Sequence, residues 1–165
     1  MGTSQGLSIS MIDLNEVAEY ISNQSESSKI YIGGDSYRFT RNGRWFAEYT
    51  LVVVVHIDGK HGCKIFGETS QEPDYDSNQG KPSMRLMNEV YKIADLYLKL
   101  KEVIGDREVQ IHLDINAKES AGSSCVVQQA VGYIRGVCNV VPQTKPHAFA
   151  ASCAADRAKE LKIAV

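Results

Sequence analysis

Two acidic residues of this chain end apolar segments, where a carboxylate could act on a ligand. Asp35 follows Gly33 and Gly34 in the segment YIGGDS, and Asp114 closes the segment IHLDIN. Glycines leave room for a ligand, and a strand end lies at an exposed rim of a sheet, so both positions suit binding. Ionised side chains are rarely buried without a partner, and a cation is one such partner. Considered alone, Asp35 could equally be an aspartate that forms an ordinary turn.

Two further acids are expected on helices. Glu89 lies three residues after Leu86 and four before Ile93, so helical spacing places it on the apolar stripe that faces the sheet. Asp156 ends a run of small residues (AASCAAD), which would let a helix lie close to the sheet. Each has a plainer interpretation: Glu89 could reach solvent at the edge of the stripe, and Asp156 could pair with a neighbouring basic residue.

Polar residues beside these acids are candidates for supporting roles. His147 could pass a proton to a leaving group, or could simply cap the helix that begins there. Lys145 could contact a phosphate or remain solvated. Ser36 and Asn116 each follow a candidate ligand closely, so we expect them to orient ligands or contact substrate.

His112 raises the separate question of a zinc site. It precedes Asp114 by two residues, so strand alternation places both side chains on one face of the sheet. A His-x-Asp pair could contribute to zinc binding, but two residues do not make a site. We therefore expect His112 to be a half-buried histidine whose hydrogen bonds are satisfied.

The hydropathy pattern predicts the helices and strands that position these residues. Three strands joined by tight turns predict an antiparallel meander, and two later strands, each reached through a helix, predict parallel pairing. The expected fold class is α/β, a mixed five-stranded sheet flanked by helices. A tail and helix (1–28) would pack on a domain formed by residues 29–165. The predicted strands cover 29–32, 44–57, about 61–66, 109–113 and 138–141; the predicted helices cover about 14–21, 82–105, 123–136 and 148–161, with a polar loop at 67–81.

Composition limits how the chain could bind a partner. The formal net charge is −2, so nucleic-acid binding would have to depend on a local patch or on bound metal ions. No apolar run approaches the roughly 20 residues that cross a bilayer, and residues 1–10 lack the layout of a signal peptide. We expect a cytoplasmic protein with no membrane segment.

Three segments together resemble a known family. IGGDS around Asp35, HLDIN around Asp114, and KPHAFAASCAADR from Lys145 to Arg157 are similar to the YkuK-type bacterial proteins of the RNase H-like superfamily. The resemblance covers roughly residues 29 to 160. One departure is Gly34, where the family pattern has Thr, and we expect this glycine to loosen the backbone without removing a ligand.

The resemblance implies a metal-dependent nuclease that hydrolyses phosphodiester bonds. Two Mg²⁺ or Mn²⁺ ions would be the cofactors, and RNA, an RNA–DNA hybrid or structured DNA would be the substrate. Asp35 would bridge the ions, Glu89 and Asp114 would bind one, and Asp156 would help to bind the other. Because clustered carboxylates repel one another, the site without metal should be partly protonated.

Two other functions stay open. A non-catalytic member of the fold, kept as a binding or assembly module, would suit the mildly acidic composition. A metal-assisted phosphate hydrolase acting on a small substrate is the third possibility. The set of four acids favours the nuclease, because a binding module has no need of clustered carboxylates. Oligomeric state is left open, since the aromatic residues near positions 31 and 45–49 could lie in the core or at an interface.

Overall fold

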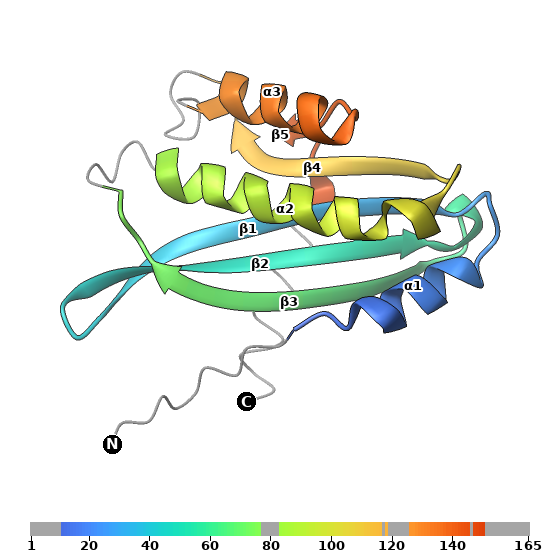
Figure 1. Ribbon diagram of the computed structural model, residues 1–165, viewed down its shortest axis with the longest axis horizontal. Coiled ribbons are helices and arrows are strands. Elements are labelled where there is room, and N and C mark those ends of the chain that lie inside the picture. Colours follow the sequence, from blue (N-terminus) through green and yellow to red (C-terminus); the bar gives the residue numbers. More distant parts are fainter. Residues whose placement is uncertain (1–10, 77–82, 117, 119–125, 146, 151–165) are drawn as a thin grey trace.

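The computed structural model describes residues 11–76, 83–116, 118, 126–145 and 147–150. These residues form a five-stranded sheet with strand order β3-β2-β1-β4-β5 (Figure 1). β1, β2 and β3 are antiparallel, whereas β4 pairs parallel with β1 and with β5, so the predicted α/β class is confirmed. The elements are α1 (Leu14–Ser22), β1 (Lys29–Arg41), β2 (Arg44–His56), a short 3-10 turn (Ile57–Gly59), β3 (Cys63–Pro73), α2 (Ser83–Ile104), β4 (Glu108–Asn116), α3 (Val127–Cys138) and β5 (Gln143–Lys145).

The first strand is much longer than the sequence pattern predicts. β1 runs from Lys29 to Arg41 and pairs with β2 along its whole length, so Asp35 lies inside the strand and not at its end. The two glycines interrupt the apolar pattern but not the backbone ladder to β2. The turn predicted after Arg41 is confirmed, since Asn42 and Gly43 have φ values of 53° and 76° that suit a tight hairpin.

Several other boundaries differ from the prediction. β4 continues to Asn116, so Asp114 also lies inside a strand and not at its end. β3 continues through Gly67 to Pro73, because its polar residues lie on an edge strand and still pair with β2. Gly136 lies inside α3, and Asn139, with a left-handed backbone, is the C-cap. The strand predicted at 138–141 is therefore wrong, and the fifth strand begins later, at Gln143. Burial of Ile134 and Cys138, four residues apart, explains why the helix continues past the glycine.

The core lies between the sheet and the helices α1, α2 and α3. Alternate residues of β1 and β2, such as Ile32 and Val53, pack there with Val90 and Ile93 of α2. The intervening residues face the other side of the sheet, where Tyr31, Val52 and Val54 meet Ala150. Among the helices that the structure describes, none combines the length and the apolar character that a bilayer crossing requires.

Candidate functional site

Asp35 and Asp114 meet where two central strands separate. β1 and β4 pair only from Lys29↔Glu108 to Gly33↔His112, and each acid lies two residues beyond that last pair. Side chains alternate along a strand, so both acids face the side of the sheet opposite α2. The two carboxyl groups are joined by a side-chain hydrogen bond. The prediction that these acids would be neighbours is confirmed.

The two carboxyl groups titrate differently. Burial raises the pKa of Asp35 to about 7, and the hydrogen bond and negative charge of Asp114 act in the same direction. Burial also opposes ionisation of Asp114, but hydrogen bonds from Asp35 and Lys145 outweigh it and lower the pKa of Asp114. Of the two, Asp114 is therefore the group that ionises more readily, and Asp35 the group that holds a proton more tightly.

Lys145 brings a positive charge to this pair. Its Nζ lies 2.6 Å from Oδ1 of Asp114, and the hydrogen bond to that carboxylate raises the pKa of Lys145. The parallel pairing of Asn116 with Lys145 holds β5 beside β4 at this point. An ammonium group thus contacts an oxygen that would otherwise be available to a metal ion or would repel a phosphate.

Glu89 approaches the two acids from the α2 side of the sheet. Its side chain is only 2% exposed, so the prediction that it faces the sheet is confirmed and the solvent-reaching alternative is wrong. Burial raises the pKa of Glu89 to about 8, with added contributions from the charges of Asp114 and Asp35. The hydroxyl of Ser36 donates to Oε2 of Glu89 at 2.7 Å and acts in the opposite direction.

Arg85 is a residue of the site that the sequence analysis missed. Its Nη1 donates to the backbone oxygen of Ser36 at 2.8 Å and to the Ser36 hydroxyl at 2.7 Å. The Nε of Arg85 is buried and has no hydrogen-bond partner among the described residues. The signal that could have found it is its spacing: Arg85 and Glu89 are four residues apart on α2 and so share one face.

The acids supply oxygen ligands without forming a complete cage. Among the described residues, no three His, Cys, Asp or Glu side chains lie in positions to hold one ion. Asp35 and Asp114 offer adjacent oxygens, and Glu89 is bonded to Ser36. Carboxylate oxygens are the ligands that Mg²⁺ prefers. The Lys145 ammonium group already contacts Asp114, so a positive charge is accommodated beside this pair, and the chemistry of its oxygens suits a hard divalent cation.

Comparison with known proteins assigns the family. A family model described as Ribonuclease H-like matches residues 13–160. The chain belongs to the ribonuclease H-like family. The matched range includes α1 (Leu14–Ser22). No curated protein and no solved structure gave a match.

The other predicted site residues of this RNase H-like protein have different outcomes. Asp156 lies outside the described residues. His147 is exposed, its backbone N–H donates to the carbonyl of Thr144 at 2.8 Å, and its ring makes no contact with the acids in the described structure. Asn116 accepts a hydrogen bond from the backbone N–H of Lys118 at 2.9 Å, so at least one role of its side chain is to support its own turn.

His112 has satisfied hydrogen bonds, as its position predicts, but it is more deeply buried than the expected half-buried histidine. It is fully buried, its Nδ1 accepts from the backbone N–H of Ala150 at 3.0 Å, and its Nε2 lies 2.9 Å from Oε1 of Gln110. Burial lowers the pKa of His112 to about 4, so the ring is neutral at pH 7. His112 thereby fixes the segment after Lys145 against the sheet, on the same face as Asp114.

The two glycines before Asp35 allow close packing of the strand. A Cβ on Gly33 would lie 2.8 Å from the Cβ of Ala150, which confirms close approach of a small residue there. A Cβ on Gly34 would lie 2.9 Å from the carbonyl oxygen of Thr50 and 3.3 Å from Cδ1 of Ile93. Gly34 pairs with Leu51 in the β1–β2 ladder, and its lack of a side chain allows this close packing.

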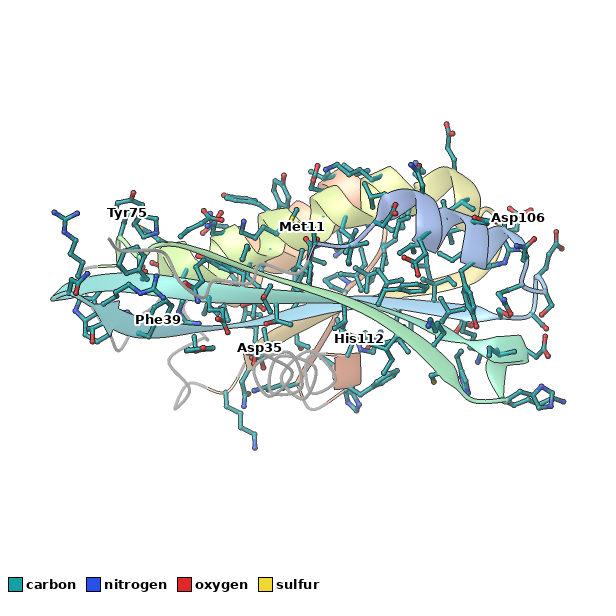
Figure 2. The ribbon with its side chains drawn as sticks, turned by 90° about the horizontal axis from the view of Figure 1, so that it is seen from below. Met11, Asp35, Phe39, Tyr75, Asp106 and His112 are labelled. Atoms are coloured by element: carbon teal, nitrogen blue, oxygen red, sulfur yellow. The ribbon has the colours of Figure 1, made fainter. Side chains whose placement is uncertain are left out.

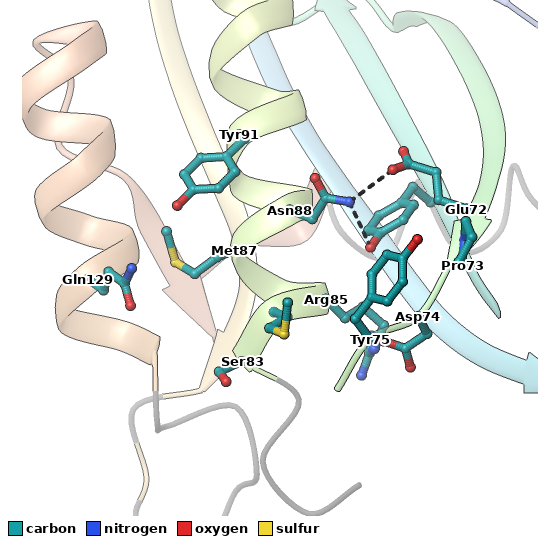
Figure 3. A pocket seen from close by; sticks show the side chains of 12 residues that line it. Glu72, Pro73, Asp74, Tyr75, Ser83, Arg85, Met87, Asn88, Tyr91 and Gln129 are labelled. Carbon is teal, nitrogen blue, oxygen red and sulfur yellow. Dashed lines mark hydrogen bonds between the residues drawn. The ribbon is translucent and has the colours of Figure 1, made fainter. Parts of the chain in front are cut away.

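A cavity of about 520 Å³ lies beside the site in this RNase H-like protein (Figure 3). It is bordered by the start of α2, the end of β3 and Gln129 of α3. Within it, Nδ2 of Asn88 donates to the Tyr49 hydroxyl at 3.1 Å and to Oε1 of Glu72 at 3.2 Å. Arg85 lines the cavity and also binds Ser36, so it links this space to the acids.

Proposed function

We propose that this protein is a nuclease that hydrolyses phosphodiester bonds with the help of two Mg²⁺ or Mn²⁺ ions. The main support is the hydrogen-bonded pair of Asp35 and Asp114 with the buried Glu89 close by. Two of these three acids have pKa values of about 7 and 8, which means that their charges are poorly compensated by the protein alone. A carboxylate group of this kind is stabilised when a cation binds.

Each residue would have a defined task in that reaction. When bound, the two ions would hold the attacking water and the leaving oxygen of an in-line displacement. Asp35, Glu89 and Asp114 would supply ligands, joined by Asp156 as the family resemblance implies. Ser36 and Arg85 would keep Glu89 in place.

The two basic candidates would act on the substrate. Lys145 lies within reach of Asp114, so its ammonium group could pass from that carboxylate to a substrate phosphate. His147, which is exposed on the segment after β5, would return a proton to the leaving oxygen. The substrate would be RNA, an RNA–DNA hybrid or structured DNA in the cytoplasm. We also propose that, within the family, the chain stands close to the YkuK-type proteins.

A non-catalytic binding module is the second candidate, and one observation favours it. Lys145 pairs with Asp114, while Ser36, itself bound by Arg85, donates to Glu89. These contacts compensate part of the acidic charge without any ion. A member of the fold that had lost catalysis would keep such contacts to remain stable.

A cleavage assay separates the two candidates. Purified protein would be incubated with single- and double-stranded DNA, single-stranded RNA, an RNA–DNA hybrid and a four-way junction, each with Mg²⁺ or Mn²⁺. The nuclease requires cleavage that depends on metal, is lost in Asp114→Asn and persists in Asp106→Asn, a matched change at an exposed acid. If the folded protein cleaves none of these substrates, or if Asp114→Asn cleaves as well as the wild type, the proposal is wrong.

A further inference from the structure

The β1–β2 hairpin extends past the site and is basic and aromatic. Residues 37–46 read YRFTRNGRWF, with three arginines and no acid, in a chain whose net charge is −2. Arg38 is ion-paired with Asp74, so Arg41 and Arg44 supply the positive charge at the tip. Pairing with β4 ends at Gly33, and pairing with β3 ends at Phe46, so the tip of the hairpin projects beyond both neighbouring strands (Figure 1). The tip of the hairpin is therefore locally positive, although the net charge of the whole chain is negative.

One face of this hairpin is continuous with the face that carries Asp35. Side chains alternate, so Asp35, Tyr37, Phe39 and Arg41 lie on one side of β1. Figure 2 shows Asp35 on the side of the sheet away from α2. The register places Phe46 opposite Phe39, and Arg44 opposite Arg41, on that same side. We call this set the hairpin surface: Tyr37, Phe39, Arg41, Arg44 and Phe46.

The rings and guanidinium groups of the hairpin surface form an ordered layer. The rings of Phe39 and Phe46 are stacked, with centroids 5.8 Å apart and an interplanar angle of 22°, and the Tyr37 ring lies 6.0 Å from that of Phe39. The guanidinium carbon of Arg41 lies 5.5 Å from the centroid of Phe39 and 5.8 Å from that of Phe46. Tyr37 is 38% exposed, and Arg41 and Arg44 are also exposed, so the layer is accessible.

We propose that the hairpin surface binds a single strand of nucleic acid and leads it to Asp35. Unpaired bases can stack on exposed aromatic rings, whereas the bases of a duplex are already stacked on one another. Arginine side chains can pair with the phosphates of the strand. Arg41 lies six residues from Asp35 along an extended strand, or about 20 Å, so a short oligonucleotide could contact both. The inference rests on the proposed nuclease function, for which it names the form of the substrate.

A binding assay tests the inference without any need for catalysis. Fluorescence anisotropy would be measured with labelled ten-nucleotide oligomers of uridine and of thymidine, and with a blunt DNA duplex, in the absence of divalent metal. The wild type should prefer either single strand to the duplex. The double variant Arg41→Gln/Arg44→Gln should bind the single strands at least about tenfold more weakly, and the slope of log K against log salt should fall by about 1.4.

Two further variants make the result specific. Tyr37→Leu should weaken binding about fivefold or more while leaving the salt slope unchanged, because it removes a stacking surface and no charge. Lys60→Gln/Lys64→Gln removes the same charge from exposed positions at the other end of the sheet and should leave binding unchanged. Melting temperatures would show that each variant is folded.

The outcomes separate this inference from the nuclease proposal. The proposed role of the hairpin surface would be wrong if Arg41→Gln/Arg44→Gln bound the single strands with wild-type affinity. It would also be wrong if the Lys60→Gln/Lys64→Gln control lost as much affinity, even if the protein cleaves nucleic acid. A change of oligomeric state in the arginine variant, with unchanged affinity for the single strands, would also contradict the proposal, because the surface would then join copies of the chain. Weakened binding confined to the arginine and tyrosine variants would support it, whatever the cleavage assay gives.

Discussion

The hydroxyl of Ser36 donates a 2.7 Å hydrogen bond to Oε2 of Glu89, which joins β1 to α2 beside the acidic pair. Ser36 follows Asp35 directly, so strand alternation sends the carboxyl group to one face of the sheet and the hydroxyl to the other. Consecutive residues of one strand thus contribute to both sides of the site. The orientation of Glu89 therefore depends on the same backbone segment that positions Asp35.

Replacing Ser36 with alanine should raise the pKa of Glu89 above about 8. The Ser36 hydroxyl stabilises the ionised form of Glu89, and its loss leaves burial and the neighbouring negative charges uncompensated. The measurement is a ¹³C NMR titration of the glutamate carboxyl groups, assigned with Glu89→Gln. Ser22→Ala, which changes an exposed serine at the end of α1, should leave that titration unchanged. A pKa that stays the same or falls in Ser36→Ala would contradict this role.

Glu89 should make the protein less stable as the pH rises from about 4.5 to about 8. Its pKa is raised on folding, so over this range the native state binds more protons than the unfolded state, and the free energy of unfolding falls with pH. Glu89→Gln should remove this fall and be more stable than the wild type at pH 8.5 by about 2–4 kcal/mol.

Urea unfolding at pH 5, 7 and 8.5 would measure this effect. The lowered pKa of Asp114 acts below about pH 4, outside this window, whereas the raised pKa of Asp35 adds a smaller loss of stability of the same sign. Glu102→Gln, at an exposed position of the same helix, is the matched control and should follow the wild type. Parallel pH curves for Glu89→Gln and the wild type would show that Glu89 is not the cause.

Replacing Lys145 with glutamine should strengthen Mg²⁺ or Mn²⁺ binding severalfold. The Lys145 ammonium competes with a cation for Oδ1 of Asp114, and its removal frees that oxygen. The measurement is the rise in melting temperature with metal: at 100 times the Kd, a ligand adds about 2.7 kcal/mol to the free energy of unfolding, or about 5–10 °C. In the Asp35→Asn variant, metal should no longer raise the melting temperature. Equal rises in the wild type and Asp35→Asn would refute the assignment of the acids as ligands.

Replacing Gly34 with alanine should destabilise the fold by about 1–3 kcal/mol. The new Cβ would lie 2.9 Å from the carbonyl oxygen of Thr50 and 3.0 Å from Cδ2 of Leu51, and the backbone oxygen cannot move without breaking the ladder. Gly132→Ala in α3 has open space around it and should stabilise by about 0.5–1 kcal/mol through helix propensity. Urea unfolding compares the two, and a neutral Gly34→Ala would show that β1 and β2 can separate at this point.

The fold class and part of the site could be predicted because they depend on local patterns. Helical spacing placed Glu89 toward the sheet, and strand alternation placed His112 and Asp114 together; both predictions are confirmed. The family match likewise follows from the sequence. For Glu89, His112 and Asp114 the information lies within a few neighbouring residues, since side-chain direction in a helix or strand has a fixed period.

Strand lengths and the partners of the acids required the tertiary structure. The pattern around Gly33 and Gly34 reads as a strand end, yet β1 continues because β2, which follows it after a tight turn, provides backbone hydrogen bonds along its whole length. The contacts Arg85–Ser36 and Lys145–Asp114 join residues 49 and 31 positions apart, which no local period relates. The sequence by itself determined which acids this protein carries and the elements that bear them. Only the packing of sheet and helices decided which charges meet, because distance in space, and not along the chain, governs hydrogen bonds and electrostatic interactions.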